Sequence, residues 1–417
     1  MSNFPFTFRL HKETIMRANM ISAVIILSLS VVLPASYAGA EDGVTAHEIV
    51  IGMSTALSGP SAFLGTSFRA GAEAFLSRVN DSGGVHGRKI RLITYDDRYE
   101  PANATANVNK MIKEDRVFCL LGNVGTPTTL AIKPILDEKR VVLFAPFTGA
   151  ESLRKPVDRY LLHYRASYNQ EIEAFVKGMV DVLGYRKIAV FHQDDGYGKA
   201  VLDGTKLALQ ARGLTPVATG IYTRNFENVI PAVDSIMKER PDAVVMGGTY
   251  SACSKFIRTW KRKAFLAGKA RDLGPVFMNV SFVGPDRLAT MLENYGNGVV
   301  VTQVVPPFSQ GGANFPAVNE YLAALGKYAG GAAPTFGSLE GYLATKVFVE
   351  ILRRAGTNPT RESFIQAAEG VRDLDIHAGN RISFSKDNHQ GSQEVYLTVI
   401  KNGDFIPITD WRTVKTH

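Results

Sequence analysis

The fold is decided by the segment Glu48-Ile-Val-Ile-Gly-Met-Ser-Thr-Ala-Leu-Ser-Gly-Pro60. Its first part, Glu48–Thr55, is a short apolar run typical of a buried strand, and the small and hydroxyl residues after it are typical of a loop. The next segment, Thr66–Asp81, carries Phe68 and Phe75 on one apolar helical face. A strand, a loop and a helix in this order predict the start of a parallel βαβ unit.

The same alternation of short apolar runs and amphipathic segments continues along the first part of the chain. Parallel strands joined by right-handed helical crossovers are buried on both faces, which explains why the runs are continuously apolar. This first series comprises strands at Glu48–Thr55, Lys89–Asp97, Val117–Asn123 and Val141–Pro146, and helices at Thr66–Asp81, Ala102–Asp115 and Pro127–Arg140.

A second series begins near Arg165. Two successive series of this kind predict two doubly wound, Rossmann-like lobes. The second series comprises strands at Lys187–Gln193, Val217–Tyr222, Ala243–Gly248 and Val276–Phe282, and helices at Gln170–Leu183, Lys199–Arg212, Asn228–Arg240 and Ser251–Ala264.

The rest of the chain has too few elements to form a third domain. They would complete the two sheets already begun, so the chain is expected to cross between the lobes more than once. These elements are a strand at Val299–Val305, helices at Phe315–Tyr328, Leu339–Arg354 and Arg361–Val371, and a hairpin of Glu394–Ile400 with Asp404–Ile408.

The N-terminus has the three parts of a secretory signal peptide. Residues 1–17 hold three cations and one acid, residues 21–33 are uncharged and apolar, and small residues lead to Ala38 and Ala40, after either of which cleavage is expected. The alternative is a membrane anchor, but a span needs about 20 apolar residues. Residues 1–40 are therefore predicted to be removed on export.

The two cysteines, Cys119 and Cys253, are expected to be small buried hydrophobic residues, because neither stands in a metal-binding or redox spacing. Without the leader, the net charge of the chain falls from +8 to +6. No partner follows from this charge, and nucleic acid has no obvious place outside the cytoplasm. The densest basic cluster could attract an anionic surface but is interpreted as a solvated helix face. It consists of Arg258, Lys261, Arg262, Lys263, Lys269 and Arg271.

Catalytic motifs are absent from the sequence. It has no phosphate-binding P-loop, no zinc-protease motif and no nucleophile elbow. Gly196 and Gly198 resemble the start of a dinucleotide loop, but Val201 stands where the third glycine belongs. Asp96 and Asp97 could imitate a catalytic pair, although such residues more often cap helices or line a polar cleft. We therefore predict a binding protein rather than an enzyme, with no cofactor and no metal.

Ligands bind beyond the carboxyl ends of parallel strands, and the loops there are rich in hydroxyl groups and small residues. They include Ser58 after the first strand, Asn123 and Thr126 after the third, and Thr148 after the fourth. Backbone amides at a helix start, helped by threonine hydroxyls, can hold a carboxylate without a cation. The alternative for Thr126 is simple helix capping. Three such loops on one sheet edge favour a small anionic ligand.

Five stretches, spread in order along nearly the whole mature chain, carry a family resemblance. They are Glu48–Pro60, Gly83-Gly-Val-His-Gly-Arg-Lys-Ile90, Tyr95-Asp-Asp97, Phe191-His-Gln-Asp-Asp-Gly-Tyr-Gly198 and Ser338-Leu-Glu-Gly-Tyr342. In these stretches the chain resembles type I periplasmic binding proteins, especially the leucine/isoleucine/valine-binding proteins of branched-chain amino-acid ABC importers.

This resemblance implies two lobes that are joined by three crossovers and close around a ligand. The first lobe would comprise residues 47–166 and 303–383, and the second residues 167–302 and 384–417. The implied function is that of the periplasmic substrate-binding component of an ABC importer. It would be a monomer that captures a branched-chain amino acid or a related carboxylate and delivers it to a permease.

The resemblance also carries the family's ligand contacts onto residues of both lobes. Closure needs contacts from the second lobe, and we expect Tyr197, Tyr250 and Phe282 to supply them. The family positions are Thr126 for the carboxylate-binding hydroxyl, Phe147, Thr148 and Gly149 for the loop after the fourth strand, Tyr197 for a tyrosine, and Thr249 or Tyr250 for an aromatic residue.

Two positions depart from the family pattern. The acid that grips the ammonium group of the ligand falls near Ser281, and a tyrosine of the first helix falls on Leu64. A buried ammonium needs a compensating charge. Glu340, Asp194 or Asp195 could supply it; otherwise the ligand is a carboxylate without an α-amino group, or another small polar metabolite. A rival function is a ligand-sensing subunit of a periplasmic signalling receptor.

Overall fold

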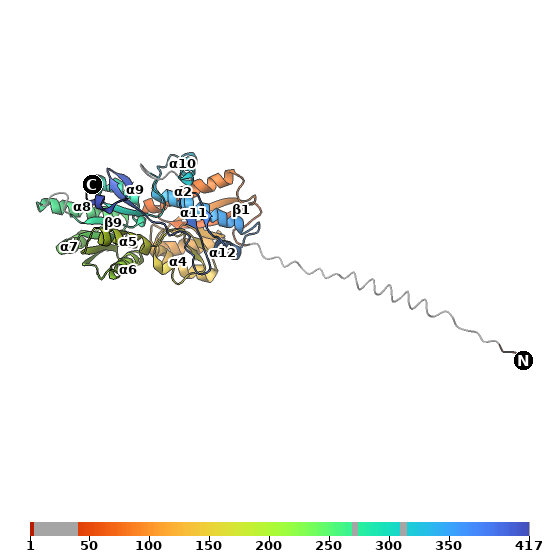
Figure 1. The fold of residues 1–417 in the computed structure, drawn as a ribbon. Coiled ribbons are helices and arrows are strands. Elements are labelled where there is room, and N and C mark those ends of the chain that lie inside the picture. The colour runs from red at the N-terminus through yellow and green to blue at the C-terminus, as the bar shows by residue number, and fades with distance from the viewer. Residues whose placement is uncertain (4–40, 269–273, 309–314, 417) are drawn as a thin grey trace. The chain divides into compact units, whose positions relative to one another are not determined.

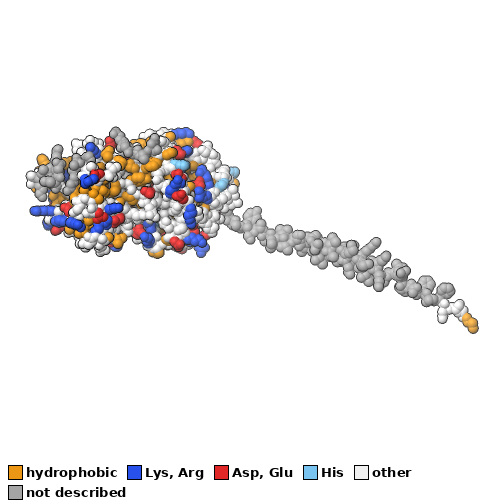
Figure 2. Space-filling view, in the orientation of Figure 1, with side chains coloured by type: hydrophobic (Ala, Val, Ile, Leu, Met, Phe, Trp, Pro, Cys, Tyr) orange, Lys and Arg blue, Asp and Glu red, His pale blue; other side chains and the backbone are white. Residues whose placement is uncertain are grey.

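The computed structural model describes residues 1–3, 41–268, 274–308 and 315–416 (Figure 1). Residues 4–40 of the predicted signal peptide lie outside these residues. Glu41–His417 cluster as one unit, which is described below. Among the described residues, no helix has both the length and the apolar character needed to span a membrane. Acidic and basic side chains are interspersed over the face shown in Figure 2.

The first sheet has five parallel strands in the order β2-β1-β3-β4-β5. Seven of the eight residues of β1 are buried, as the apolar run predicts, and its neighbours on both sides are parallel. The predicted doubly wound arrangement is confirmed for this half of the chain. The strands are β1 (Glu48–Thr55), β2 (Lys89–Asp96), β3 (Cys119–Leu121), β4 (Leu143–Phe144) and β5 (Leu161–Leu162).

Helices from two distant parts of the chain cover this first sheet (Figure 1). In the first of two close pairs, α2 packs on α11 where Gly71 and Gly341 leave room: a Cβ on Gly71 would lie 1.8 Å from the carbonyl oxygen of Ser338. In the second pair α3 packs on α4. These helices are α2 (Ala62–Asp81), α3 (Pro101–Lys113), α4 (Thr126–Lys139), α10 (Pro316–Tyr328), α11 (Phe336–Arg354) and α12 (Arg361–Glu369).

The second sheet has seven strands in the order β14-β13-β10-β9-β8-β6-β7. Strands β6 to β10 are parallel, and the C-terminal hairpin of β13 and β14 adds antiparallel to β10. The strands are β6 (Ile188–Gln193), β7 (Ala218–Tyr222), β8 (Ala243–Gly247), β9 (Val276–Asn279), β10 (Val300–Gln303), β13 (Tyr396–Lys401) and β14 (Asp404–Pro407).

The helices of this second half pack in sequence order, with α5 on α6, α7 on α8 and α8 on α9. Helix α5 continues into a π-helical segment at Lys177–Val182, where the sequence predicts one uninterrupted helix. The helices are α5 (Tyr168–Val176), α6 (Gly196–Gln210), α7 (Ile230–Glu239), α8 (Tyr250–Leu266) and α9 (Pro285–Leu292).

The chain passes between the two sheets three times: after β5, after β10, and after the short hairpin of β11 (Leu374–Asp375) and β12 (Arg381–Ile382). Hereafter the first lobe denotes the five-stranded sheet with its helices, and the second lobe denotes the seven-stranded sheet with its helices. The residue boundaries of the lobes drawn from the sequence stay predictions.

Several predicted elements differ in detail from the structure. Strand β9 ends at Asn279, and Ser281–Val283 form a 3₁₀ turn where the strand was expected to continue. Gly284, at φ +80°, then turns the chain into α9, a short helix that the sequence analysis missed. Strand β5 was also missed because it has only two residues, too few for a periodic signal.

Candidate ligand-binding cleft

The loops at the carboxyl edge of the first sheet are held by Asp96 and Asp97. The Asp96 carboxylate accepts hydrogen bonds from the backbone amide of Leu57 at 2.9 Å and from the amide and hydroxyl of Ser58. Asp97 accepts one from the hydroxyl of Ser54 at 2.9 Å, and burial raises its pKa to about 6. Both acids shape the loops after β1 and β2, which explains their position without catalysis.

Two threonine hydroxyls meet in the first lobe. Thr126 begins α4, Thr148 follows β4, and their Oγ1 atoms lie 2.7 Å apart in a fully buried position. The alternative that Thr126 merely caps the helix is wrong, because Gly125 is the N-cap and no side chain caps α4. Thr148 also donates to the hydroxyl of Tyr168, at 3.3 Å, which lies on α5 of the second lobe. A hydroxyl pair thus stands at a helix start beside the lobe junction.

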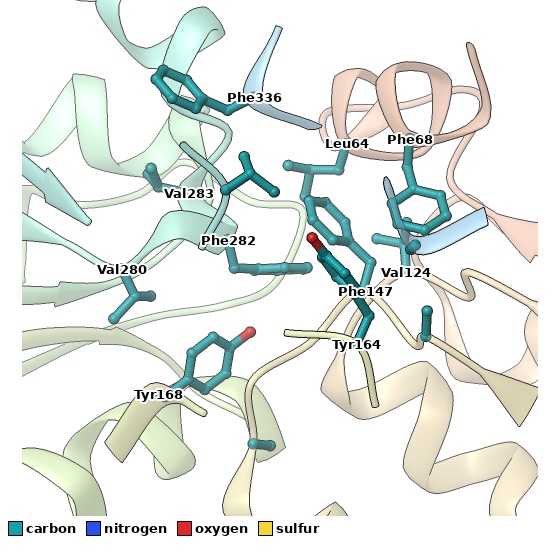
Figure 3. Packing of buried hydrophobic residues seen from close by; sticks show 14 of the residues in the cluster. Leu64, Phe68, Val124, Phe147, Tyr164, Tyr168, Val280, Phe282, Val283 and Phe336 are labelled. Atoms are coloured by element: carbon teal, nitrogen blue, oxygen red, sulfur yellow. The ribbon is translucent and has the colours of Figure 1, made fainter. Parts of the chain in front are cut away.

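Phe282 is the centre of an aromatic cluster between the lobes (Figure 3). Its ring centroid lies 4.8 Å from that of Tyr197 in the second lobe and 5.5 Å from that of Phe147 in the first. Tyr99, at 6.1 Å, and Tyr168, at 6.5 Å, complete the cluster. All five side chains are buried. The predicted contacts Phe147, Tyr197 and Phe282 therefore lie together, whereas the sequence analysis missed Tyr99 and Tyr168.

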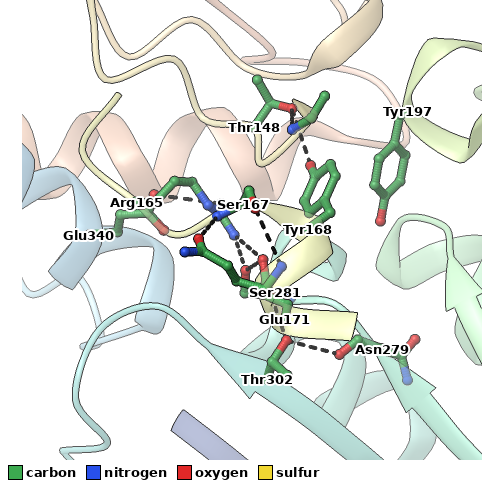
Figure 4. A network of polar contacts seen from close by, with 12 residues as sticks. Thr148, Arg165, Ser167, Tyr168, Glu171, Tyr197, Asn279, Ser281, Thr302 and Glu340 are labelled. Carbon is green, nitrogen blue, oxygen red and sulfur yellow. Dashed lines mark hydrogen bonds and ion pairs between the residues drawn. The ribbon is translucent and has the colours of Figure 1, made fainter. Parts of the chain in front are cut away.

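Ser281 connects this cluster to a buried charge network (Figure 4). Its backbone amide donates to Glu171 at 2.7 Å, and its hydroxyl donates to the same carboxylate at 3.0 Å. Glu171 also pairs with Arg165 at 3.1 Å and accepts a hydrogen bond from Thr302. Ser281, where the resemblance predicts an ammonium-binding acid, thus contacts a carboxylate that is already paired with Arg165.

The three acids suggested as substitutes are also engaged or exposed. Glu340 is buried 3.6 Å from Arg165, and burial raises its pKa to about 7. Asp195 caps α6 and pairs with Arg224 at 2.8 Å, while Asp194 is exposed. None of them is an unpaired buried carboxylate. The structure therefore offers no unpaired buried acid for an ammonium group at these three positions.

Two buried asparagines have unsatisfied amides. Asn123 follows β3 and Asn279 ends β9, so each stands at the carboxyl edge of one sheet. Neither side-chain amide has a hydrogen-bond partner among the described residues. Leaving such a buried polar group unpaired costs about 1–3 kcal/mol. Asn123 was predicted from its loop, whereas Asn279 lay inside a run expected to be a strand.

Three further predicted residues, Ser58, Tyr250 and Leu64, are held by contacts with their neighbours. Ser58 binds Asp96, as described above. The hydroxyl of Tyr250 accepts a hydrogen bond from the amide of Phe63 at 3.3 Å, which joins α8 to α2. Leu64 is buried, and a Cβ on Gly284 would lie 3.0 Å from it. The contacts of Tyr250 and Leu64 join the two lobes directly.

Charged groups also bridge the lobes. Arg224 in the second lobe donates to Glu100 of the first lobe at 3.0 Å and to Asp195 of its own lobe at 2.8 Å. Asp286 on α9 accepts a hydrogen bond from the amide of Phe336 at the start of α11, at 3.0 Å. Together with the contacts of Tyr250 and Leu64, these bonds hold the two lobes against each other.

Comparison with known proteins identifies this architecture. A model of the family described as "Periplasmic binding protein" matches residues 48–404. The chain belongs to the periplasmic binding protein family. Members of this family are solute-binding proteins and not enzymes. In the part of the chain that the structure describes, no three His, Cys, Asp or Glu side chains are grouped as metal ligands.

Relatives within the family bind amino acids. An "Amino acid binding protein" of Pseudomonas aeruginosa is 25% identical over 76% of this chain and 82% of that protein. The Leu/Ile/Val-binding protein of Escherichia coli K12 is 24% identical over 67% of this chain and 73% of its own. This chain thus has a substrate-binding role, and its resemblance to the leucine/isoleucine/valine-binding proteins is confirmed.

Solved structures agree with the fold. The crystal structure of a possible leucine/isoleucine/valine-binding protein from Rhodopirellula baltica has a TM-score of 0.81 and 33% identity, covering 90% of this chain and 99% of that one. The crystal structure of a branched-chain amino-acid ABC transporter from Thermus thermophilus, with bound valine, has a TM-score of 0.75 and 19% identity. The match covers 89% of this chain and 100% of that one. The predicted fold class is confirmed.

Proposed function

We propose that this chain is an exported, periplasmic protein that captures a small carboxylate between its lobes and delivers it to an ABC importer. The observation that carries this proposal is the buried hydroxyl pair of Thr126 and Thr148, 2.7 Å apart at the start of α4, beside the aromatic cluster around Phe282. Helix starts favour negative charge, and hydroxyls there can donate to a carboxylate.

The charges around Ser281 favour a ligand without an α-ammonium group. Glu171 already accepts hydrogen bonds from Ser281 and Thr302 and pairs with Arg165. A ligand ammonium would have to compete for this carboxylate in a buried site, where an unpaired charge is costly. The apolar part of the ligand would contact the rings around Phe282, and its remaining polar groups would satisfy the amides of Asn123 and Asn279.

Closure would follow from contacts that exist only when the lobes meet. The bonds from Arg224 to Glu100 and from Asp286 to the start of α11 cross the junction. A ligand that touches Thr126 on one side and Tyr197 on the other would add its own contacts to these and shift the population toward the closed form. The closed form, as a monomer, would then dock on the permease.

A thermal-shift screen of the mature protein tests the ligand class. The compounds should be matched pairs, each an α-amino acid and the same acid without its amino group. A ligand at 100 times its Kd stabilises the folded protein by about 2.7 kcal/mol. We expect larger shifts with the des-amino compounds. Larger shifts with the amino acids would contradict the ligand class while leaving the transport role intact.

The variant Thr126→Val tests the carboxylate site. Removing a hydroxyl that donates to a charged group costs about 1.5–3 kcal/mol, so Kd should rise roughly 10- to 100-fold. Thr205→Val is the matched control, because the Thr205 hydroxyl is buried but bonds only to the carbonyl of Val201 in its own helix, at 2.8 Å. Equal losses of affinity in both variants would refute the assignment of Thr126.

A further inference from the structure

The C-terminal end of α8 exposes two large apolar side chains. Phe265 is 65% exposed and Leu266 is 74% exposed, although both close a helix whose opposite face is buried. That buried face includes Phe256 and Trp260, which pack on each other with ring centroids 6.0 Å apart. Exposing two adjacent large hydrophobic residues at a helix end is unfavourable in water and marks an interaction site when other features support it.

Cations share the exposed face with these apolar residues. Arg258, Lys261 and Arg262 precede Phe265 at the spacings of neighbouring residues on one helical face, and α8 contains no acid. Two of the cations are positioned by neutral carbonyl groups: Arg258 donates to the carbonyl of Met291, and Lys261 to that of Tyr295, each at 2.7 Å. We call Arg258, Lys261, Arg262, Phe265 and Leu266 the α8 tip.

Among the described residues, Arg258 and Arg262 of the α8 tip have no close ion pair. Glu293 approaches Arg258 only to 4.0 Å; the Glu293 side chain is largely exposed and that of Arg258 is about half-buried. Arg262 has no ion pair among the described residues. Lys263, next along the helix, pairs instead with Asp234 of α7. The sequence alone suggested a solvated basic face. The exposed Phe265 and Leu266 beside these cations indicate an interaction site instead.

The α8 tip lies far from the cleft. Tyr250 begins α8 where the lobes meet, and 17 helical residues at 1.5 Å each carry the chain about 25 Å away. Figure 1 shows α8 running to the end of the second lobe, and Figure 2 shows Lys and Arg side chains at that end. A surface bound there would leave the ligand-binding cleft accessible.

We propose that the α8 tip binds an anionic lipid surface. Cations attract acidic headgroups, while Phe and Leu at the same helix end can enter the boundary between headgroups and acyl chains. The α8 tip projects rather than forming a pocket, and a projecting apolar end fits a soft lipid surface better than the flat face of an acidic protein. Such binding would keep the protein close to the membrane that holds its partner.

Co-sedimentation of the full mature chain with vesicles tests this proposal. We expect binding to vesicles of phosphatidylglycerol mixed with phosphatidylcholine, and little binding to pure phosphatidylcholine. Each cation near such a surface contributes about 1 kcal/mol, so Arg262→Glu should weaken the partition coefficient at least about fivefold. Raising the salt should weaken binding too, because the Debye length falls from about 30 Å at 0.01 M to about 8 Å at 0.15 M.

Matched controls separate the α8 tip from general charge and general apolarity. Lys206→Glu changes the net charge as much as Arg262→Glu, at an exposed position of α6. Phe226→Ser removes a phenylalanine that is 67% exposed, as a control for Phe265→Ser. Both controls should bind vesicles like the wild type. Equal losses in controls and tip variants, or equal binding to neutral vesicles, would overturn the proposal. If neither the wild type nor any variant bound vesicles, and the protein bound acidic proteins instead, the proposal would also be overturned.

Discussion

Replacing Arg165 with methionine should destabilise the protein more than any surface charge change. The guanidinium group is 1% exposed and lies 3.1 Å from Glu171 of the second lobe and 3.6 Å from Glu340 of the first. Methionine fills part of the volume but leaves two buried carboxylates without their cation. Removing one partner of a buried pair costs about 3–5 kcal/mol.

Thermal unfolding followed by circular dichroism measures this loss. At roughly 2 °C per kcal/mol for a chain of this size, Tm should fall by about 6–10 °C. Arg412→Met is the control, because Arg412 forms an exposed pair with Asp410 at 2.8 Å and such pairs contribute little. The control should unfold at the wild-type temperature.

The pH dependence of this effect identifies its cause. Burial raises the pKa of Glu340 from 4.5 to about 7 in the folded protein, so its carboxyl group binds protons more tightly when folded than when unfolded. Its contribution to stability is therefore complete below pH 4.5 and is lost as the pH rises through 7. Without Arg165 the pKa should rise further, and Arg165→Met should lose more stability at pH 8 than at pH 5. Equal losses at both pH values, or a loss no larger than that of Arg412→Met, would refute this reasoning.

Three further predictions concern packing, closure and pH. Gly71→Ala should destabilise the first lobe by about 1–3 kcal/mol, because the new Cβ would lie 1.8 Å from a backbone oxygen of α11. As a control, Gly326→Ala in α10 should stabilise the protein by about 0.5–1 kcal/mol, because a Cβ there meets nothing within 4 Å. Urea unfolding measures both changes. Asp286→Ala removes the bond to the amide of Phe336 and should shift the ligand-free protein toward open forms, seen as a larger radius of gyration in small-angle scattering; an unchanged radius would count against this role. Glu340→Gln should flatten the decrease of wild-type stability between about pH 4 and 8, which is worth roughly 3 kcal/mol for a pKa shift of about 2.5. An unchanged slope would assign that decrease to another group.

The sequence predicted the fold well because its signals are local and repeated. The bounds of β1 agree with the prediction to the residue, and both cysteines are buried thiols as expected. Continuous apolar runs and helical periodicity depend only on neighbours along the chain, so each βα unit can be found separately. Elements without such periodicity, such as the two-residue β5 and the eight-residue α9, were missed.

The candidate site was predicted less completely, because its chemistry depends on pairings between distant residues. Thr126 could be proposed from its loop, but its bond to Thr148 spans two strands and excludes simple capping. Glu171 gave one usable signal, a charged residue on the otherwise apolar buried face of α5 beside Ile172 and Phe175. Its partner Ser281 is 110 residues away, which no local pattern reveals.

The network around Ser281 connects the aromatic cluster to Arg165 in the first crossover through a continuous series of contacts. Phe282 is in the aromatic cluster, and its neighbour Ser281 donates two hydrogen bonds to Glu171. Glu171 pairs with Arg165 in the first crossover, and Arg165 reaches Glu340 on α11 in the other lobe. A ligand that shifts Phe282 must also shift the residue next to it, and therefore the geometry of buried charges that span both lobes. Because separating buried charges is costly, this chain of contacts can favour two discrete arrangements of the lobes over a continuous range.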